Sequence, residues 1–359
     1  MSASGLSWRL LRLERLVARL RKYWVSRRKE SRQVYVQDRV REFRTMWSAV
    51  AEAVGAQFCD VTEQIWEIRR GAKRTRISNY KLEIDNPVIL EIAGNKPLVY
   101  RLLSEAGLRV PEHRVFELGE LHVAEAFLQS HPRGCVIKPA DGTSSGLGVT
   151  THVLSRCEVR KAAVLASLYH SKLLIEEMIS GESYRLLVFE GEVIHAVRRR
   201  CPRLIADGVS SVAELIAEEN ARRHGRCEAA IEIDRDCRFT LESQALSLSA
   251  IPPKGGVFAV QSVGDPERRQ VEVRTIYNEP ATDLICETLK RDAESVAAIL
   301  GSRFLGVDIV TSDPSVPLGQ SAGAIIEANT TPGLHHHYDM RREQYPEAAR
   351  VVIKTLLDR

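Results

Sequence analysis

The sequence has no apolar run near the roughly 18 to 20 residues needed to cross a bilayer, and its N-terminus lacks an uninterrupted signal-type apolar segment. Its seven cysteines form neither CxxC pairs nor short Cys/His clusters. These absences argue against a membrane-spanning helix, a disulfide framework and a structural zinc site. We therefore expect a cytoplasmic protein with reduced, mostly structural cysteines.

The 359 residues, 44% of them apolar, suffice to bury one large core or several interlocked smaller ones. A net charge of +4 is too small to imply nucleic acid, but the charge is unevenly placed. Residues 1–44 hold thirteen Arg or Lys against four Asp or Glu, which gives +9 there and leaves −5 for the remainder. The chain thus has a mildly acidic body behind a basic N-terminal segment.

The segment LSWRLLRLERLVARLRKYW (6–24) places leucines and a valine at helical spacing and fills other positions with arginine. This pattern predicts a basic amphipathic helix. Such a helix can dock or dimerise through its apolar face, contact a membrane surface, or bind a partner peptide or acidic carrier. The sequence does not separate these roles.

Hydrophobic periodicity and turn residues predict the remaining elements, with no internal repeat and no low-complexity segment. The predicted helices cover 47–54, 96–107, 158–170, 212–224 and 282–300. The predicted strands cover 64–70, 74–78, 135–139, 149–153, 172–179, 184–189, 193–199, 304–311 and 324–328.

A lysine and a loop of small residues stand together in KPADGTSSGLG (138–148). Small residues let backbone N–H groups approach phosphate oxygens, hydroxyls can donate further hydrogen bonds, and Lys138 adds positive charge. The segment is not a P-loop, because the lysine precedes the glycines and no GK[ST] follows. It indicates a phosphate-binding loop, with a plain hairpin turn as the alternative.

Three oxygen-bearing side chains lie on two otherwise apolar strands: Asp308 in FLGVDIV, and Glu327 and Asn329 in AIIEANTTPG. A carboxylate in apolar surroundings is costly unless it is paired or binds a metal. Hard oxygen ligands without nearby cysteine favour Mg²⁺ held together with substrate phosphates. The alternative is a buried acid paired with an arginine.

The segment IEEMISGESYRLLV (175–188) is a strand that ends in acids, a glycine turn, and a second strand that carries Arg185. Backbone groups of such a connection can read an adenine edge, and an acid beyond it can hold a ribose hydroxyl. An edge strand with a solvated acidic end is the alternative.

In their order and span these segments resemble the ATP-grasp ligases, from about Asn95 to the C-terminus, and among them the cyanophycin-synthetase and glutathione-synthetase groups. The most specific match is SYRLLVFEGEVIHAVRRRCPRLIADGVSSVAELIAEENARR (183–223), which is similar to that group's YRLLV, RR, GDG and N...RRG pattern. The resemblance implies an α/β (α+β) fold in which antiparallel sheets and helices form interlocked lobes around ATP. Its expected parts are a basic extension (1–44), an N-terminal α/β lobe (45–120), a central lid lobe (121–182) and a C-terminal lobe with the magnesium and substrate sites (183–359).

Carried over by position, the resemblance implies ATP and two Mg²⁺ ions, which Mn²⁺ can replace, held by Asp308, Glu327 and Asn329. It assigns Arg185, Arg198 and Arg199 to the γ-phosphate and the acyl phosphate, with Arg185 also at the substrate. The implied nucleotide-binding residues are Lys96, Lys138, Thr143, Ser144, Ser145, Gly146, Gly148, Glu176, Glu177, Met178, Ile179, Glu182 and Ser183.

The sequence departs from the family pattern at the ribose and at the substrate. The family places an acid two residues after the hinge glycine, where this chain has Ser183, with Glu182 displaced by one. The stretch that follows IPPKGG (251–256) shares little with the family's substrate loop. In the run His335, His336 and His337 adjacent side chains point in different directions, which argues against a single metal site, and His337 matches a family histidine near the substrate.

We therefore expect a ligase that joins the carboxylate of an amino acid, small peptide or related metabolite to an amine, through an acyl phosphate and with release of ADP and phosphate. Another ATP-grasp chemistry, such as phosphotransfer, and a nucleotide-binding module without turnover are the alternatives. Cyanophycin synthetases have a second half with its own GKT P-loop, and this sequence contains no such half. We therefore expect a stand-alone ligase rather than polymer synthesis. The resemblance further implies a homo-oligomer, and nothing indicates a nucleic-acid partner.

Overall fold

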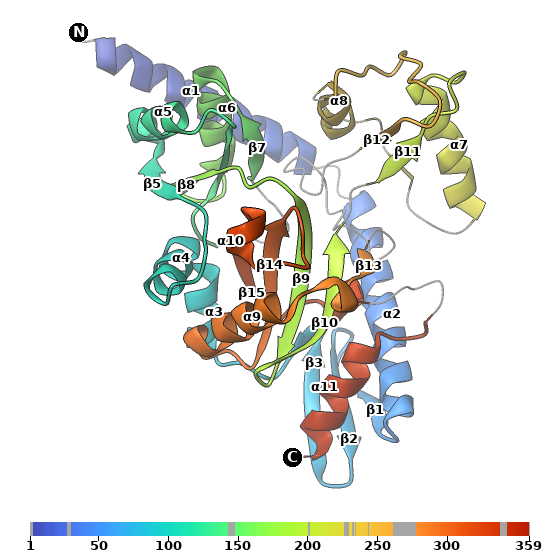
Figure 1. Ribbon diagram of the computed structural model, residues 1–359. Helices are drawn as coiled ribbons and strands as arrows, with labels where there is room; N and C mark the ends of the chain where they lie inside the picture. The colour runs from blue at the N-terminus through green and yellow to red at the C-terminus, as the bar shows by residue number, and fades with distance from the viewer. Residues whose placement is uncertain are drawn as a thin grey trace. The chain divides into compact units, whose positions relative to one another are not determined.

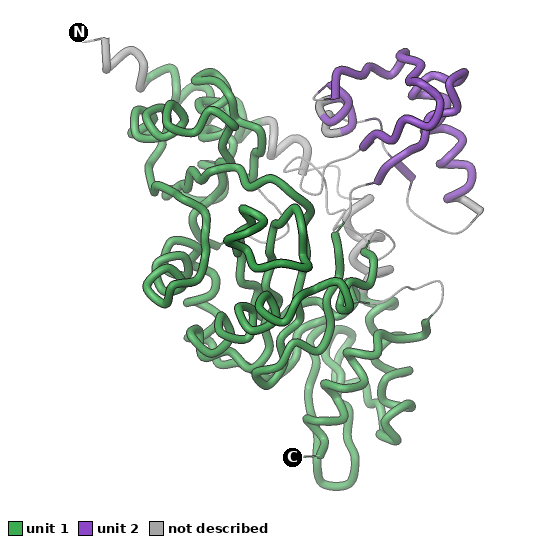
Figure 2. The backbone as a smooth tube through the Cα atoms, viewed as in Figure 1, with its two compact units in different colours: residues 1–199, 274–359 green, residues 200–273 purple. Residues whose placement is uncertain are grey.

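The computed structural model describes residues 3–26, 30–142, 148–199, 202–225, 230–231, 233, 235–242, 244–260, 278–337 and 343–358. In the two N-terminal helices it describes side chains for 9–20 and from 40 onward. The chain divides into two compact units, Met1–Arg199 with Arg274–Arg359, and Arg200–Val273 (Figure 2). Each unit is described by itself.

The described residues of the first unit form three antiparallel sheets (Figure 1). The N-terminal sheet has the order β1-β2-β3-β4 and packs with α2 and α11 around Trp47, Trp66 and Ile77, each at most 1% exposed. The bounds of these elements are α2 Glu30–Ala53, β1 Gln57–Asp60, β2 Ile65–Arg70, β3 Lys73–Ser78, β4 Lys81–Leu82 and α11 Glu347–Asp358.

The second sheet, called the lid sheet below, has the order β5-β8-β6-β7, and it forms the lid lobe together with its helices. Successive side chains of a strand point to opposite faces of the sheet. One face packs on helices α5 and α6 through fully buried side chains, namely Cys135, Ile137, Leu173 and Ile175. Lys138 and Glu176 therefore point to the other face. This lobe comprises β5 His113–Glu117, η1 Leu118–Glu120, α5 Leu121–Ser130, β6 Cys135–Pro139, β7 Thr150–Val153, α6 Arg156–Ala166 and β8 Lys172–Glu177, and α1 Ala3–Ser26 packs on α6.

The third sheet, called the central sheet below, has five strands in the order β13-β10-β9-β14-β15. One face packs on α9, α3 and α4 through a core of aliphatic side chains, and the other face carries Arg185 and Asp308 as direct partners on neighbouring strands. The elements are α3 Pro87–Gly94, α4 Lys96–Glu105, β9 Glu182–Phe189, β10 Glu192–Arg199, β13 Asn278–Pro280, η3 Thr282–Leu284, α9 Glu287–Leu300, β14 Phe304–Thr311, α10 Leu318–Ser321, β15 Ala324–Thr330 and η4 Leu334–His337.

The second unit is small. It consists of the pair β11 (Arg203–Ile205) and β12 (Val257–Ala259) with the helices α7 (Val212–Gly225) and α8 (Arg235–Glu242). Its own core of buried aliphatic and aromatic side chains includes Ile216 and Phe258, at 1% and 4% exposure. A separate core of this kind lets a segment form a compact body of its own.

The mixed α/β architecture with antiparallel sheets confirms the predicted fold class. The predicted domain boundaries stay predictions, and two features of the structure bear on them. The boundary after residue 120 separates β5 from β8, although the two strands are hydrogen-bonded neighbours. The expected C-terminal lobe, 183–359, also contains the second compact unit, Arg200–Val273. Neither feature was visible in the sequence, because both depend on pairing between distant segments.

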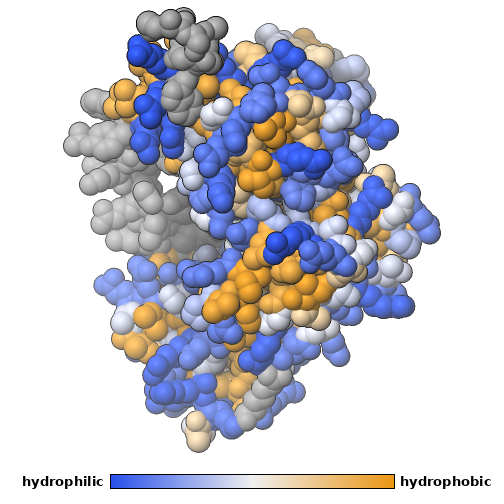
Figure 3. Space-filling view, turned by 90° about the vertical axis from the view of Figure 1, so that its left-hand side faces the viewer, coloured by the Kyte–Doolittle hydropathy of each residue, from blue (hydrophilic) through white to orange (hydrophobic). Residues whose placement is uncertain are grey.

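The surface agrees with the composition. No helix among the described residues is long and apolar enough to cross a membrane. On the face shown in Figure 3, hydrophilic residues cover most of the surface and hydrophobic residues form separate patches.

Candidate active site

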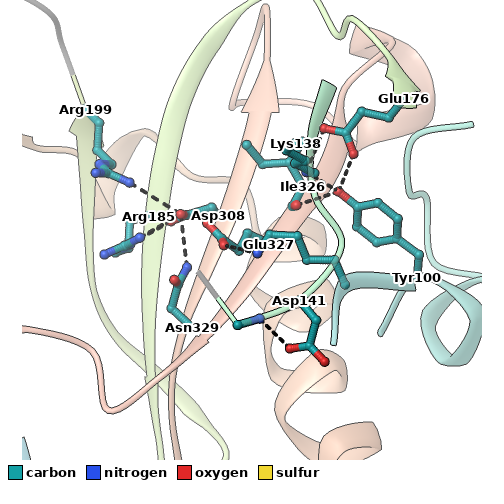
Figure 4. Close-up of polar contacts among 12 residues, drawn as sticks. Tyr100, Lys138, Asp141, Glu176, Arg185, Arg199, Asp308, Ile326, Glu327 and Asn329 are labelled. Carbon is teal, nitrogen blue, oxygen red and sulfur yellow. Dashed lines mark hydrogen bonds and ion pairs between the residues drawn. The ribbon is translucent and has the colours of Figure 1, made fainter. Parts of the chain in front are cut away.

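Asp308 lies in the middle of β14 and is 2% exposed. Arg185 donates from Nε and Nη2 to its two carboxylate oxygens at 2.6 and 2.7 Å. Arg199 of β10 donates from Nη1 to Oδ2 at 3.4 Å (Figure 4). Burial alone raises the pKa of this carboxyl, but the charges of Arg185 and then Arg199 outweigh burial, and the pKa of Asp308 lies below its ordinary value. Asp308 is therefore ionised at neutral pH and is balanced by two guanidinium groups.

The other two oxygen-bearing side chains come from the neighbouring strand β15. Glu327 is the direct partner of Asp308, and Asn329, two residues further, points to the same face of the sheet. Asn329 donates from Nδ2 to Asp308 Oδ2 at 3.1 Å, which leaves its amide oxygen as an acceptor. Glu327 is 30% exposed at its side chain and places Oε1 3.2 Å from Lys96 Nζ. The three predicted oxygen ligands thus lie together on one face.

Tyr100 connects the lid sheet to β15. Its hydroxyl accepts from Lys138 Nζ at 3.0 Å and lies 2.9 Å from Glu176 Oε2 and 2.6 Å from the carbonyl oxygen of Ile326 (Figure 4). Lys138 Nζ also pairs with Glu176 Oε1 at 2.7 Å, and both side chains are at most 7% exposed. Burial, and then the charge of Glu176, holds the pKa of Tyr100 well above its usual value, so the phenol stays protonated.

Helix α4 brings Lys96 and Tyr100 to this place. Asn95 caps the helix with a hydrogen bond from Leu98 N to its side-chain oxygen at 3.0 Å, and the helix begins at Lys96. Residues four positions apart lie on the same side of a helix, so Lys96 and Tyr100 reach toward the same strand, β15. Lys96 was predicted from the sequence and Tyr100 was not, although their four-residue spacing was a usable signal.

The predicted adenine-reading segment, Glu176 to Ile179, begins with the last two residues of β8. Glu177 N and Met178 N donate to the carbonyl oxygens of Glu112 and Gly134 at 3.0 and 3.2 Å, which fixes the strand end, and Ile179 follows half-buried. At Gly181 the φ angle is +138°, and a Cβ atom would lie 2.2 Å from the carbonyl carbon of Thr311. Only glycine allows the chain to pass β14 this closely.

Gly148 closes the predicted phosphate loop. A Cβ atom there would lie 2.8 Å from Tyr169 Cδ2, and its φ is +77°. The predictions for Thr143, Ser144, Ser145 and Gly146 lie outside the described residues.

Arg198 lies on the opposite face of the central sheet from Asp308, because neighbouring residues of a strand point to opposite sides. It pairs there with Glu182, at 3.1 Å from Nη1 to Oε2, and with Glu279, at 3.1 Å from Nε to Oε2. Arg185 and Arg199 share the face of Asp308. The structure thus brings two of the three predicted arginines to the acid and separates Arg198 and Glu182 from it, while Ser183, opposite Arg199, remains on its side.

Histidines lie beside these arginines. His337, 3% exposed, places Nδ1 3.1 Å from Nδ1 of His195 on β10. Burial, then His195 and the charge of Arg185, keeps the pKa of His337 well below its usual value, so the ring is neutral. His337 was predicted from the sequence and His195 was not. The signal was its spacing of four from Arg199 along one strand, which places both on one face.

Among the described residues, no group of three or more His, Cys, Asp or Glu side chains is placed so that it could hold a metal ion. The chemistry of Asp308, Glu327 and Asn329 nevertheless fits Mg²⁺, which takes carboxylate and amide oxygens and completes its shell with phosphate oxygens and water. Lys96 and Arg185 neutralise the two carboxylates in this structure. The arginine pairing that was the alternative to a metal site is present, and a metal ion at Asp308 would compete with it.

Comparison with known proteins relates the chain to a group of biosynthetic enzymes. A cyanophycin synthetase from a Nostoc species is 32% identical over 254 residues, which are 69% of this chain and 27% of that protein. The glutathione biosynthesis bifunctional protein GshAB of Enterococcus faecalis is 26% identical over 302 residues, or 81% of this chain and 39% of that protein. The chain thus spans between about a quarter and two fifths of the length of these relatives.

The fold has a counterpart among solved structures. A bifunctional glutathione synthetase from Pasteurella multocida superposes with a TM-score of 0.56 and 24% identity, covering 86% of this chain and 43% of that one. No protein-family model matches the sequence. The motifs around Lys138, Arg185 and Asp308 agree with the sequence similarity to the two kinds of synthetase and with the shared fold. The chain therefore belongs to the ATP-grasp superfamily.

Proposed function

We propose that this protein is an ATP-dependent carboxylate–amine ligase. It would phosphorylate the carboxylate of an amino acid, small peptide or related metabolite and then join the acyl group to an amine, with release of ADP and phosphate. The observation that carries the proposal is the gathering of Asp308, Glu327 and Asn329 on one sheet face beside Arg185 and Arg199. Cations and oxygen ligands in one place suit a reaction that moves a phosphoryl group.

The nucleotide would lie between the lid sheet and the central sheet. Lys138 is held by Glu176 and Tyr100, so its ammonium group is already positioned for an ATP phosphate or the adenine. The backbone of Glu177 to Ile179 would read the adenine edge, and Lys96 would contact a phosphate. Glu182 is engaged by Arg198 on the far face, which leaves Ser183 better placed for the ribose.

Asp308, Glu327 and Asn329 would hold magnesium, which would supply positive charge against the phosphates of ATP. Arg185 and Arg199 would then direct their guanidinium groups to the γ-phosphate and to the acyl phosphate made from it. Arg185 is buried and Arg199 half-buried next to the ligands, and their fixed charge favours stabilisation of developing negative charge. In this assignment Arg198 orders the opposite face and does not touch the reacting atoms.

The substrate carboxylate oxygen would attack the γ-phosphorus, and the bond to ADP would break. The amine would then attack the acyl carbon, lose a proton, and expel phosphate. His337 and His195 would lie near the amine, where a neutral imidazole can accept a hydrogen bond from it. No covalent enzyme intermediate is required.

The test is turnover with ATP, Mg²⁺ and pools of amino acids and short peptides, with ADP and new amide products measured by mass spectrometry. We expect Glu327→Gln to abolish product formation. Glu190→Gln is the matched control, because Glu190 lies in the turn that joins β9 to β10, has 23% of its side chain exposed and pairs with Arg303. AMP in place of ADP, or full turnover by Glu327→Gln, would refute the proposed mechanism.

A further inference from the structure

Helix α1 is fixed to the lid lobe along one edge. Leu11, 5% exposed, belongs to the hydrophobic core of that lobe. Arg15 donates from Nη2 to the carbonyl oxygen of Ser167 at 2.8 Å, and Arg160 pairs with Glu14 at 2.6 and 2.9 Å. The helix is therefore held in a defined rotation about its axis.

The opposite side of the same helix presents an apolar stripe. Its members are each about half exposed, namely Leu10 (48%), Leu13 (57%), Leu16 (53%), Val17 (57%) and Leu20 (52%). At 100° per residue they fall on one side of the helix and span about 15 Å of its length. No described residue covers this stripe. Five neighbouring aliphatic side chains in water are unfavourable and mark a contact surface.

Positive charge accompanies the stripe. Arg12 and Arg19 are exposed along one border of it, Arg9 is exposed at its N-terminal end, and Glu14 is the only acid between residues 9 and 20. The surplus of +9 over residues 1–44 adds to the same field. Exposed leucines bordered by arginines are complementary to a surface that offers both hydrocarbon and negative charge.

A second copy of the chain suits this surface poorly. Pairing two stripes would bring their arginine borders together, and like charges repel. A stable dimer also buries about 800 Å² per partner, which is more than five half-exposed aliphatic side chains supply. An anionic bilayer satisfies the leucines and the arginines at the same time.

We propose that the α1 stripe, Leu10, Leu13, Leu16, Val17 and Leu20, is a docking site for an anionic lipid surface. The aliphatic side chains enter the boundary between headgroups and acyl chains, and the bordering arginines contact lipid phosphates. Because the helix is fixed to the lid lobe, docking holds that lobe at the membrane. This inference is independent of the proposed ligase activity.

The experiment measures co-sedimentation of the full chain, without substrates, with phosphatidylcholine vesicles that contain or lack phosphatidylserine. We expect binding only with phosphatidylserine, and weaker binding as salt is raised. Leu13→Gln/Val17→Gln removes apolar contacts from exposed helix positions and should lower binding at least about tenfold. Leu154→Gln is the matched control, because Leu154 is 60% exposed on the same lobe outside α1.

A second variant tests the charge. Arg9→Gln/Arg19→Gln should weaken binding to phosphatidylserine vesicles and reduce its salt dependence. Absence of vesicle binding by the unmodified chain, or equal binding by the leucine variant, would overturn the proposal. So would a change from oligomer to monomer in Leu13→Gln/Val17→Gln, because the stripe would then be a contact between copies.

Discussion

Replacing Asp308 by asparagine should destabilise the fold strongly, apart from any effect on catalysis. The carboxylate is 2% exposed and accepts both hydrogen bonds of Arg185, with Arg199 as a further cation. Removal of one partner from a buried ion pair costs about 3 to 5 kcal/mol, because the other charge stays buried without compensation. At the lower end this is a change of more than about a hundredfold in the ratio of folded to unfolded protein.

Glu327 provides the comparison. Its side chain is 30% exposed and makes an ion pair, at 3.2 Å, with Lys96, so Glu327→Gln should cost about 1 kcal/mol or less. Urea unfolding of the two variants without ligands should therefore separate them by at least about 2 kcal/mol. Adding Arg185→Met to Asp308→Asn should recover part of the loss, since both charged partners are then gone.

A stability of Asp308→Asn within about 0.5 kcal/mol of the parent would refute this reasoning, because it would mean that the buried pair does not form in solution. The comparison also decides how activity data are read. Loss of turnover in Asp308→Asn mixes a folding defect with a lost metal ligand, whereas Glu327→Gln isolates the ligand.

Three further changes have defined outcomes. Tyr100→Phe removes a contact of Lys138 and should raise the Kd for ATP about fivefold, the equivalent of one hydrogen bond, as measured by calorimetry. Gly181→Ala places a Cβ 2.2 Å from the backbone of Thr311 and should cost at least about 2 kcal/mol in urea unfolding. His336 and His337 have pKa values well below the usual range because of burial and the nearby arginines. The unfolded rings bind protons below about pH 6.5 and the folded rings do not, so stability should fall as pH drops from there, by about 1.4 kcal/mol per pH unit for each ring.

Each of these predictions has a control. An unchanged Kd in Tyr100→Phe would separate the tyrosine from nucleotide binding. Gly191→Ala has no atom within 4 Å of the added Cβ, so it should cost less than Gly181→Ala, and an equal cost would contradict the steric argument. For the histidines, His337→Asn should flatten the loss of stability between pH 6.5 and 5, and an unaltered slope would contradict the assignment of those protons.

Sequence patterns predicted the elements that carry the site. The strand 135–139 and the pair 184–189 and 193–199 with their turn agree closely with β6, β9 and β10, because alternation and a Glu-Gly turn are local signals. Helix α4 likewise began at Lys96, where Asn95 caps it. The short strands β5 and β13 were missed, since a few residues at the edge of a sheet show little periodicity of their own.

What the sequence by itself determined was therefore local: which residues form strands and helices, that Asp308, Glu327 and Asn329 stand on apolar strands, and that the order of motifs is that of the ATP-grasp superfamily. The tertiary structure decided which of them meet. Strand register placed Arg185 and Arg199 on the face of Asp308 and Arg198 on the other, and α4 carried Tyr100 to Lys138 and Glu176. Packing of α1 on the lid lobe also decided which side of that helix stays exposed. The reason is that pairing and packing join residues far apart in the chain, and no local pattern contains that information.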